Sequence, residues 1–228
     1  MTAAGARRRF RLASPTGALI LGVLLLALMV ADVPLASLAH QSLAASGGSI
    51  PVWISAPFAA VGFAVAWRKP GNPLGWIIMG VAGFFALSED ASYYTVADYR
   101  LGHGGLPLGW VALLAQPGWA PGITLLGLIV LLFPDGRPPS PRWRWMIWAY
   151  AAVAMLWIAG AVTLTVGAIA GHKTQVDSGG NLQLLGGNTG AAGWWNVVQE
   201  VFFPLLVVGG GCSARWTGGS TGPVMTPA

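Results

Sequence analysis

Charged side chains are scarce in this sequence. Only 8% of its 228 residues are Asp, Glu, Lys or Arg, whereas 55% are hydrophobic. An ordinary soluble domain carries about 25% charged residues. So few charges could not cover the surface of a water-soluble protein of this length. The net charge of +5 does not indicate nucleic-acid binding, because the basic residues lie between apolar segments, where a membrane explains them.

Cysteine, histidine and catalytic motifs are also rare or absent. The single cysteine, Cys212, excludes an internal disulfide. The three histidines are too far apart in the sequence to form a recognisable metal motif. There is no Gly-rich loop ending in Gly-Lys-Ser/Thr, no Gly-x-Ser-x-Gly and no His-Glu-x-x-His. We therefore expect a protein that has no enzymatic activity of its own and that binds no cofactor or metal.

Long apolar segments make up most of the chain. A helix needs about 20 residues to cross a bilayer, and an open strand would leave backbone groups unpaired in lipid. The sequence therefore predicts an all-α, polytopic membrane protein with about six transmembrane helices. Their expected ranges are Thr16–Leu38, Pro51–Trp67, Pro73–Tyr99, Leu106–Phe133, Pro141–Ala170 and Ala191–Gly210. The expected domains are a basic N-terminus (1–15), a six-helix membrane domain (16–210) and a low-complexity tail (211–228).

Local signals support several of these boundaries. The pairs Asn72-Pro73 and Ser140-Pro141 each place a capping residue before a proline, which is favoured at the start of a helix. Pro117 and Pro121 predict a kink or a break within the fourth segment. Glycine pairs after residue 178 predict a flexible loop before the sixth segment.

The basic residues predict the orientation of the chain. If the N-terminus is cytoplasmic and the spans alternate, ten Lys and Arg residues fall inside and two fall outside, and both termini are cytoplasmic. The inner residues are Arg7, Arg8, Arg9, Arg11, Arg68, Lys69, Arg137, Arg142, Arg144 and Arg215, and the outer ones are Arg100 and Lys173. This bias predicts a multi-pass protein of a cell membrane, with the lipid bilayer as its immediate partner.

The acidic residues gather in the outer half, where they are candidates for ligand sensing. Asp90, Tyr94 and Asp98 are spaced four apart, so they share one face of the third helix. Together with Asp32 and Glu89 they predict an acidic, outward-open pocket for a cation, a cationic amphiphile or a proton. The alternative is that these groups are solvated at the outer interface.

Glu200 is the deepest acidic residue of the sixth segment. A charged group inside a bilayer is costly. We therefore expect Glu200 to face other helices and to have a functional or helix-pairing role.

Two inner loops carry a resemblance to a known family. Residues 68–76 read Arg-Lys-Pro-Gly-Asn-Pro-Leu-Gly-Trp, and residues 131–137 read Leu-Leu-Phe-Pro-Asp-Gly-Arg. In this order, with a Tyr-rich helix end between them, the loops resemble the N-terminal membrane domain of sensor histidine kinases from high-GC Gram-positive bacteria. The resemblance covers roughly residues 10–210. The loop residues expected to anchor the cytoplasmic side are Arg68, Asn72, Pro73, Asp135, Gly136, Arg137, Arg142 and Arg144.

The resemblance implies a sensory input module of a bacterial cell membrane, with a homodimeric state and a cytoplasmic signalling partner. The chain departs from the family after Leu206, because its tail holds neither a kinase domain nor a phosphoacceptor histidine. We expect a truncated or frameshifted relative. The rival hypotheses are a small proton- or cation-coupled transporter or channel that uses intramembrane carboxylates, and a plain anchoring or assembly protein.

Overall fold

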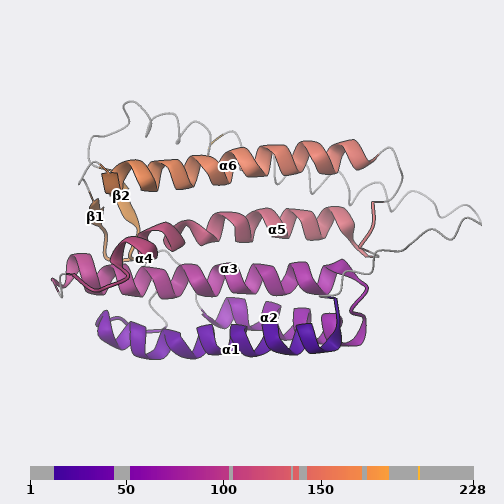
Figure 1. The fold of residues 1–228 in the computed structure, drawn as a ribbon, viewed down its shortest axis with the longest axis horizontal. Coiled ribbons are helices and arrows are strands. Elements are labelled where there is room, and N and C mark those ends of the chain that lie inside the picture. Colours follow the sequence, from indigo (N-terminus) through magenta and orange to yellow (C-terminus); the bar gives the residue numbers. More distant parts are fainter. Residues whose placement is uncertain are drawn as a thin grey trace, which may run out of the picture.

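The fold is a bundle of long helices with one small β-hairpin at an end (Figure 1). A computed structural model describes residues 13–43, 52–102, 105–134, 136–138, 143–170, 174–184 and 200. In chain order the elements are α1 (Pro15–Leu38), α2 (Val52–Arg68), α3 (Pro73–Thr95), the π-helical turn η1 (Val96–Arg100), α4 (Gly109–Ala115), the 3-10 turn η2 (Gln116–Gly118), α5 (Trp119–Leu132), α6 (Arg144–Ala170), β1 (Thr174–Val176) and β2 (Leu182–Leu184).

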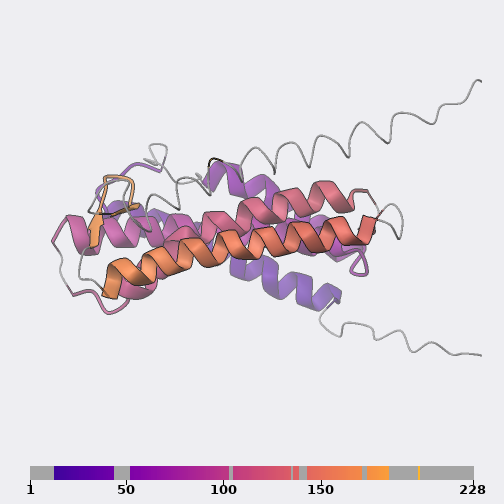
Figure 2. The ribbon, with the colours of Figure 1, turned by 90° about the horizontal axis from the view of Figure 1, so that it is seen from above.

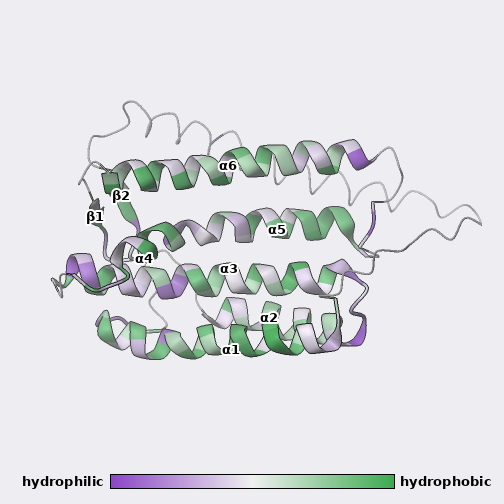
Figure 3. Cartoon of the chain, in the orientation of Figure 1, coloured by the Kyte–Doolittle hydropathy of each residue, from purple (hydrophilic) through white to green (hydrophobic). Residues whose placement is uncertain are grey.

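Membrane-spanning length is confirmed for four stretches of the described chain. They are Pro15–Leu38, Pro73–Arg100, Gly109–Leu132 and Arg144–Ala170. Figure 3 shows hydrophobic residues along most of their length and hydrophilic residues near their ends. Helix α2 has 17 residues and is not among these four stretches, so the second predicted span stays a prediction. Of the predicted sixth span, only Glu200 belongs to the described residues.

The predicted helix start at Asn72-Pro73 is confirmed, whereas the fourth segment, expected from Leu106, begins its helix at Gly109. Ser14 caps α1, because its hydroxyl accepts a hydrogen bond of 3.0 Å from the Gly17 amide. Asn72 caps α3, because its side-chain oxygen accepts a 3.0 Å bond from the Leu74 amide, and a proline follows at the first helical position. The predicted cap at Ser140-Pro141 lies outside the described residues.

The predicted interruption of the fourth segment is also confirmed. Turn η2 contains Pro117 and separates α4 from α5. Pro121 lies in the first turn of α5, where a missing amide hydrogen is tolerated. One apolar run therefore forms two helices joined by a tight turn.

Helix α3 is the centre of the bundle. It packs against α1, α2 and α5, whereas α6 lies at the edge beyond α5 (Figures 1 and 2). The contact with α2 is close: a Cβ atom added at Gly75 would lie 2.5 Å from the backbone nitrogen of Ala66. Small residues of this kind let membrane helices approach and gain van der Waals contact. In their apolar windows, 61% of the α3 span is buried, against 17% of α1.

The bundle has two unlike ends. We call the end that carries Arg68, Asn72, Gly136 and Arg144 the basic end, and the opposite end, which carries the β1–β2 hairpin, the hairpin end (Figure 1). The hairpin is antiparallel and pairs Gln175 with Gln183. The glycine pairs predict a flexible loop in this region, whereas residues 174–176 and 182–184 form two short strands that were not predicted.

Candidate functional site

A group of acidic side chains lies between α1 and α3, toward the hairpin end. Asp32 is on α1, and Glu89 and Asp90 are on α3; they are only 1%, 1% and 8% exposed, respectively. Asp32 and Asp90 interact across the contact between the two helices. We call these two residues the acid pair. The structure therefore brings together three of the predicted candidates.

The surroundings of the acid pair contain few compensating groups. No hydroxyl or N–H group of the described residues donates a hydrogen bond to either oxygen of Asp32 or to Oδ1 of Asp90. The charged groups that act on Asp90 are Asp32 and Glu89, both acidic. Two carboxyl groups in contact in apolar surroundings repel each other when both are ionised, and a shared proton replaces that repulsion with a hydrogen bond.

A metal centre is not formed by the part of the chain that the structure describes. No cluster of three or more His, Cys, Asp or Glu side chains there has the arrangement needed to hold a metal ion. Two carboxyl groups in contact can share a proton or bind a cation.

Tyr93 belongs to the same group, although the sequence analysis did not include it among the candidates. Its phenol interacts with Glu89 and lies near Asp32 and Asp90. The side chain is 2% exposed and packs with Ala36 and Val96. The sequence signal was its position four residues after Glu89, which places both on one helical face.

Asp98 and Tyr94 have a different role from the acid pair. One carboxylate oxygen of Asp98 accepts hydrogen bonds of 3.0 Å from the amides of Gly105 and Leu106. The Tyr94 hydroxyl accepts one of 3.3 Å from the Leu108 amide. Both side chains therefore hold the connection between α3 and α4. Their spacing places them on one helical face with Asp90, but they accept hydrogen bonds from the amides of the loop before α4.

Glu200 is helical and exposed. It is not among the groups that act on Asp32 or Asp90. Its chain neighbours lie outside the described residues, so its predicted partner helices remain a prediction.

The hairpin covers the hairpin-end side of the acidic group. The Thr95 hydroxyl donates a 3.0 Å hydrogen bond to the Gly180 carbonyl. The Gln116 amide donates one of 2.8 Å to Oδ1 of Asn181, and the Gln41 side chain donates to the Ser178 carbonyl. The hairpin is thus tied to α3, to η2 and to the segment after α1.

Gly180 is needed for this seating of the hairpin. Its φ is +81°, and an added Cβ atom would lie 2.7 Å from Cα of Ser92. Only glycine combines that backbone angle with so close an approach to α3.

The other half of the α1–α3 bundle is apolar. A core of Ala18, Leu25, Ala66, Met79 and Ala82 fills it. Over residues 15–26, 60–67 and 73–86 the sequence has no ionisable side chain, and its few polar groups are Thr16 and two tryptophan indoles. The polar side chains of these three helices therefore stop at the level of the acidic group.

The two loop motifs, residues 68–76 and 131–137, meet at the basic end through Asn72, Pro73 and Gly136. Gly136 has a φ of +69°, and an added Cβ atom would lie 2.7 Å from Oδ1 of Asn72 and 2.6 Å from Cδ of Pro73. Arg68, Arg137 and Arg144 are exposed around this contact. Loops far apart in the sequence thus form one surface. The predicted anchor residues Asp135 and Arg142 lie outside the described residues.

No protein-family model, curated protein or solved structure matches this chain. The resemblance to sensor kinases stays a prediction from the sequence.

Proposed function

We propose that this chain is a membrane input module of a bacterial cell, with the acid pair as its sensing site. The hairpin end then faces the outside and the basic end faces the cytoplasm. The distribution of Lys and Arg, ten against two, supports this orientation, because basic residues are enriched in cytoplasmic loops.

The observation that carries the proposal is the restriction of polarity to one half of α1–α3. In this proposal, a proton or small cation reaches the acid pair from the hairpin end. Toward the basic end it meets the packed core of Leu25, Met79 and Ala82. Transport needs access from both sides, whereas sensing needs access from one.

The response follows from the position of the acid pair between two helices. Loss of its proton places two negative charges in contact at the α1–α3 interface and favours separation of the helices. Binding of a proton or a cation favours their approach. A ligand that binds only one arrangement of the two helices shifts the equilibrium toward that arrangement.

The signal would leave through α3. Its first turn carries Asn72 and Pro73, which contact the Gly136 loop. A movement of α3 would therefore alter the surface formed by both inner loops. We propose that a cytoplasmic signalling partner binds this surface, that the module acts as a homodimer, and that it has no catalytic activity.

The experiment measures the separation of α1 and α3 directly. Leu38 and Leu101, each 40% exposed, are replaced by cysteine in a Cys212→Ser background and carry spin labels. We expect the distance distribution in nanodiscs to shift to longer values as the pH rises, and this shift to disappear in Asp32→Asn. Glu200→Gln, which removes an exposed carboxylate outside the acidic group, is the matched control and should respond like the parent.

A pH-independent distance in the parent protein contradicts the proposal. The proposal is also contradicted if Glu200→Gln abolishes the response while Asp32→Asn retains it.

The second candidate function is a proton- or cation-coupled transporter. The observation in its favour is the burial of Asp32, which is 1% exposed within a helix of membrane-spanning length, since intramembrane carboxylates also serve proton relays. Proteoliposomes with an internal pH dye separate the two functions. Proton flux above that of protein-free vesicles, lost in Asp32→Asn, would establish transport; the input module predicts no such flux.

A further inference from the structure

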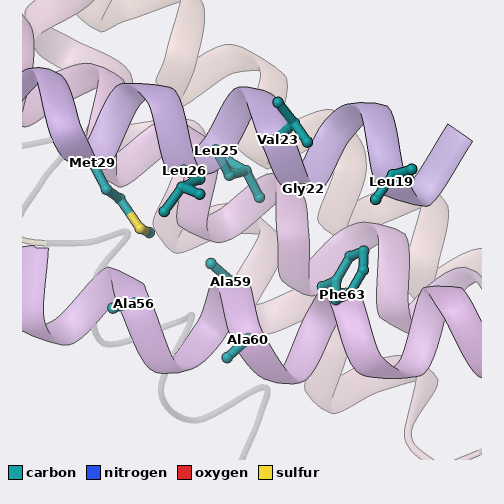
Figure 4. A pocket seen from close by; sticks show the side chains of 10 residues that line it. All are labelled: Leu19, Gly22, Val23, Leu25, Leu26, Met29, Ala56, Ala59, Ala60 and Phe63. Atoms are coloured by element: carbon teal, nitrogen blue, oxygen red, sulfur yellow. The ribbon is translucent and has the colours of Figure 1, made fainter.

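A groove without polar side chains lies between α1 and α2 (Figure 4). Its volume is about 390 Å³. Leu26 and Met29 line it from α1, and Ala60 and Phe63 line it from α2. Because a cavity of about 150 Å³ already admits benzene, this groove has room for a longer hydrocarbon segment.

The groove results from a mismatch between the two helices. Helix α2 presents alanines at positions 56, 59 and 60, whereas α1 presents long aliphatic side chains. The helices come close at Gly22, where an added Cβ atom would lie 2.8 Å from the Phe63 ring. Val23 and Leu26 are 58% and 62% exposed, so the groove opens onto the surface that faces lipid.

Basic side chains lie at the C-terminal end of α2, beyond the groove and at the basic end of the bundle. Phe63 contacts the Trp67 ring, with 5.6 Å between the ring centroids, and Trp67 is 44% exposed. Arg68 and Lys69 follow directly and are exposed. An apolar groove, an indole and two cations in this order match the acyl chain, the interfacial region and the phosphate of an anionic lipid.

We propose that the groove binds one acyl chain of an anionic phospholipid from the leaflet at the basic end, with the lipid phosphate against Arg68 and Lys69. A zwitterionic lipid offers the same chain but no net negative charge. The proposal is independent of any sensing role, since it involves neither the acid pair nor the hairpin.

The test uses the full chain in detergent, titrated with palmitoyl-oleoyl phosphatidylglycerol or phosphatidylcholine and observed by native mass spectrometry. We expect one retained phosphatidylglycerol per chain and weaker retention of phosphatidylcholine. Replacing Arg68 and Lys69 by glutamine should weaken phosphatidylglycerol binding by about fivefold for each residue, because one basic group near an anionic lipid contributes about that factor.

A matched pair of variants tests the groove itself. Ala60→Leu fills it from an exposed position, and Ala64→Leu adds the same side chain at an exposed position of α2 that does not line it. We expect Ala60→Leu to lose at least tenfold in lipid retention and Ala64→Leu to keep it. The charge variants lie outside the core, so they test the proposal even if Ala60→Leu alters folding.

Equal retention of the two lipids, or equal behaviour of Ala60→Leu and Ala64→Leu, would overturn the proposal. A second copy of the chain is the competing occupant. Efficient disulfide cross-linking between copies through Ala60→Cys, in a Cys212→Ser background and unaffected by phosphatidylglycerol, would assign the groove to a dimer interface instead.

Discussion

The two halves of the α1–α3 bundle are built from the same helices but have opposite interiors. Toward the basic end, small and aliphatic residues such as Ala66, Gly75 and Met79 pack without polar side chains. Toward the hairpin end, Asp32, Glu89 and Asp90 are buried. An acidic residue at the centre of a membrane helix costs about 2.5–3.5 kcal/mol on insertion scales. The apolar half therefore supplies packing stability, whereas the polar half carries a cost of burial that the proposed sensing site would explain.

The largest expected effect is a loss of stability when a large side chain is placed in the apolar half. In Gly75→Leu the new side chain meets the backbone of Ala66, and overpacking of this kind costs about 3 kcal/mol. We expect a strong fall in the melting temperature and in the yield of monodisperse protein, measured by fluorescence-detected size exclusion. Gly71→Ala, where an added Cβ atom meets nothing within 4 Å, should behave like the parent.

The next largest effect concerns the β1–β2 hairpin, which packs over the polar half. Gly180→Ala forces a left-handed backbone on alanine and a contact with Ser92, at a cost of about 2 kcal/mol. Hydrogen exchange of the hairpin amides should accelerate, while the amides of α2 keep their protection. Unchanged exchange in the hairpin would show that Gly180 does not hold it against α3.

A third prediction concerns the pH dependence of stability. Once both carboxyl groups of the acid pair are ionised, they repel each other across the α1–α3 contact. The parent should therefore lose stability as the pH rises, by at most about 1.4 kcal/mol per pH unit for one proton. Asp32→Asn removes one of the two charges and should flatten the curve of melting temperature against pH. A curve as steep as that of the parent would mean that other groups cause the dependence.

The smallest expected effect comes from removing the helix cap of α3 at the basic end. Asn72→Ala removes the cap of α3 and should lower the free energy of unfolding by about 1 kcal/mol. Ser14→Ala removes the equivalent cap of α1 and is the matched control. Because Asn72 also contacts the Gly136 loop, its variant should additionally expose that loop to protease, whereas the Ser14 variant should not.

The helices were largely predictable from the sequence. Hydropathy and capping are local properties, so Asn72-Pro73 marks the start of α3 and Pro117 marks the break before α5. The predicted start of the first helix differs from the observed one by a single residue. Such boundaries depend on neighbours in the chain and not on tertiary contacts.

The composition of the site was predictable only in part. The four-residue spacing groups Asp90 with Asp98, but Asp98 is bound by the amides of a returning loop, which no helical periodicity can reveal. The hairpin was missed because its three-residue strands are stabilised by Thr95, Gln116 and Gln41 from distant segments. The pairing of Asp32 with Asp90 likewise depends on how α1 packs on α3.

The most direct test of one-sided access uses the spin-labelled α1–α3 pair, Leu38→Cys with Leu101→Cys, in oriented proteoliposomes. The pH is changed on one side of the membrane at a time. We expect the distance to respond to pH on the side of the hairpin and to stay constant when the pH changes only on the side of the basic end. A response to the pH on the basic-end side, or an equal response to both sides, would contradict the account.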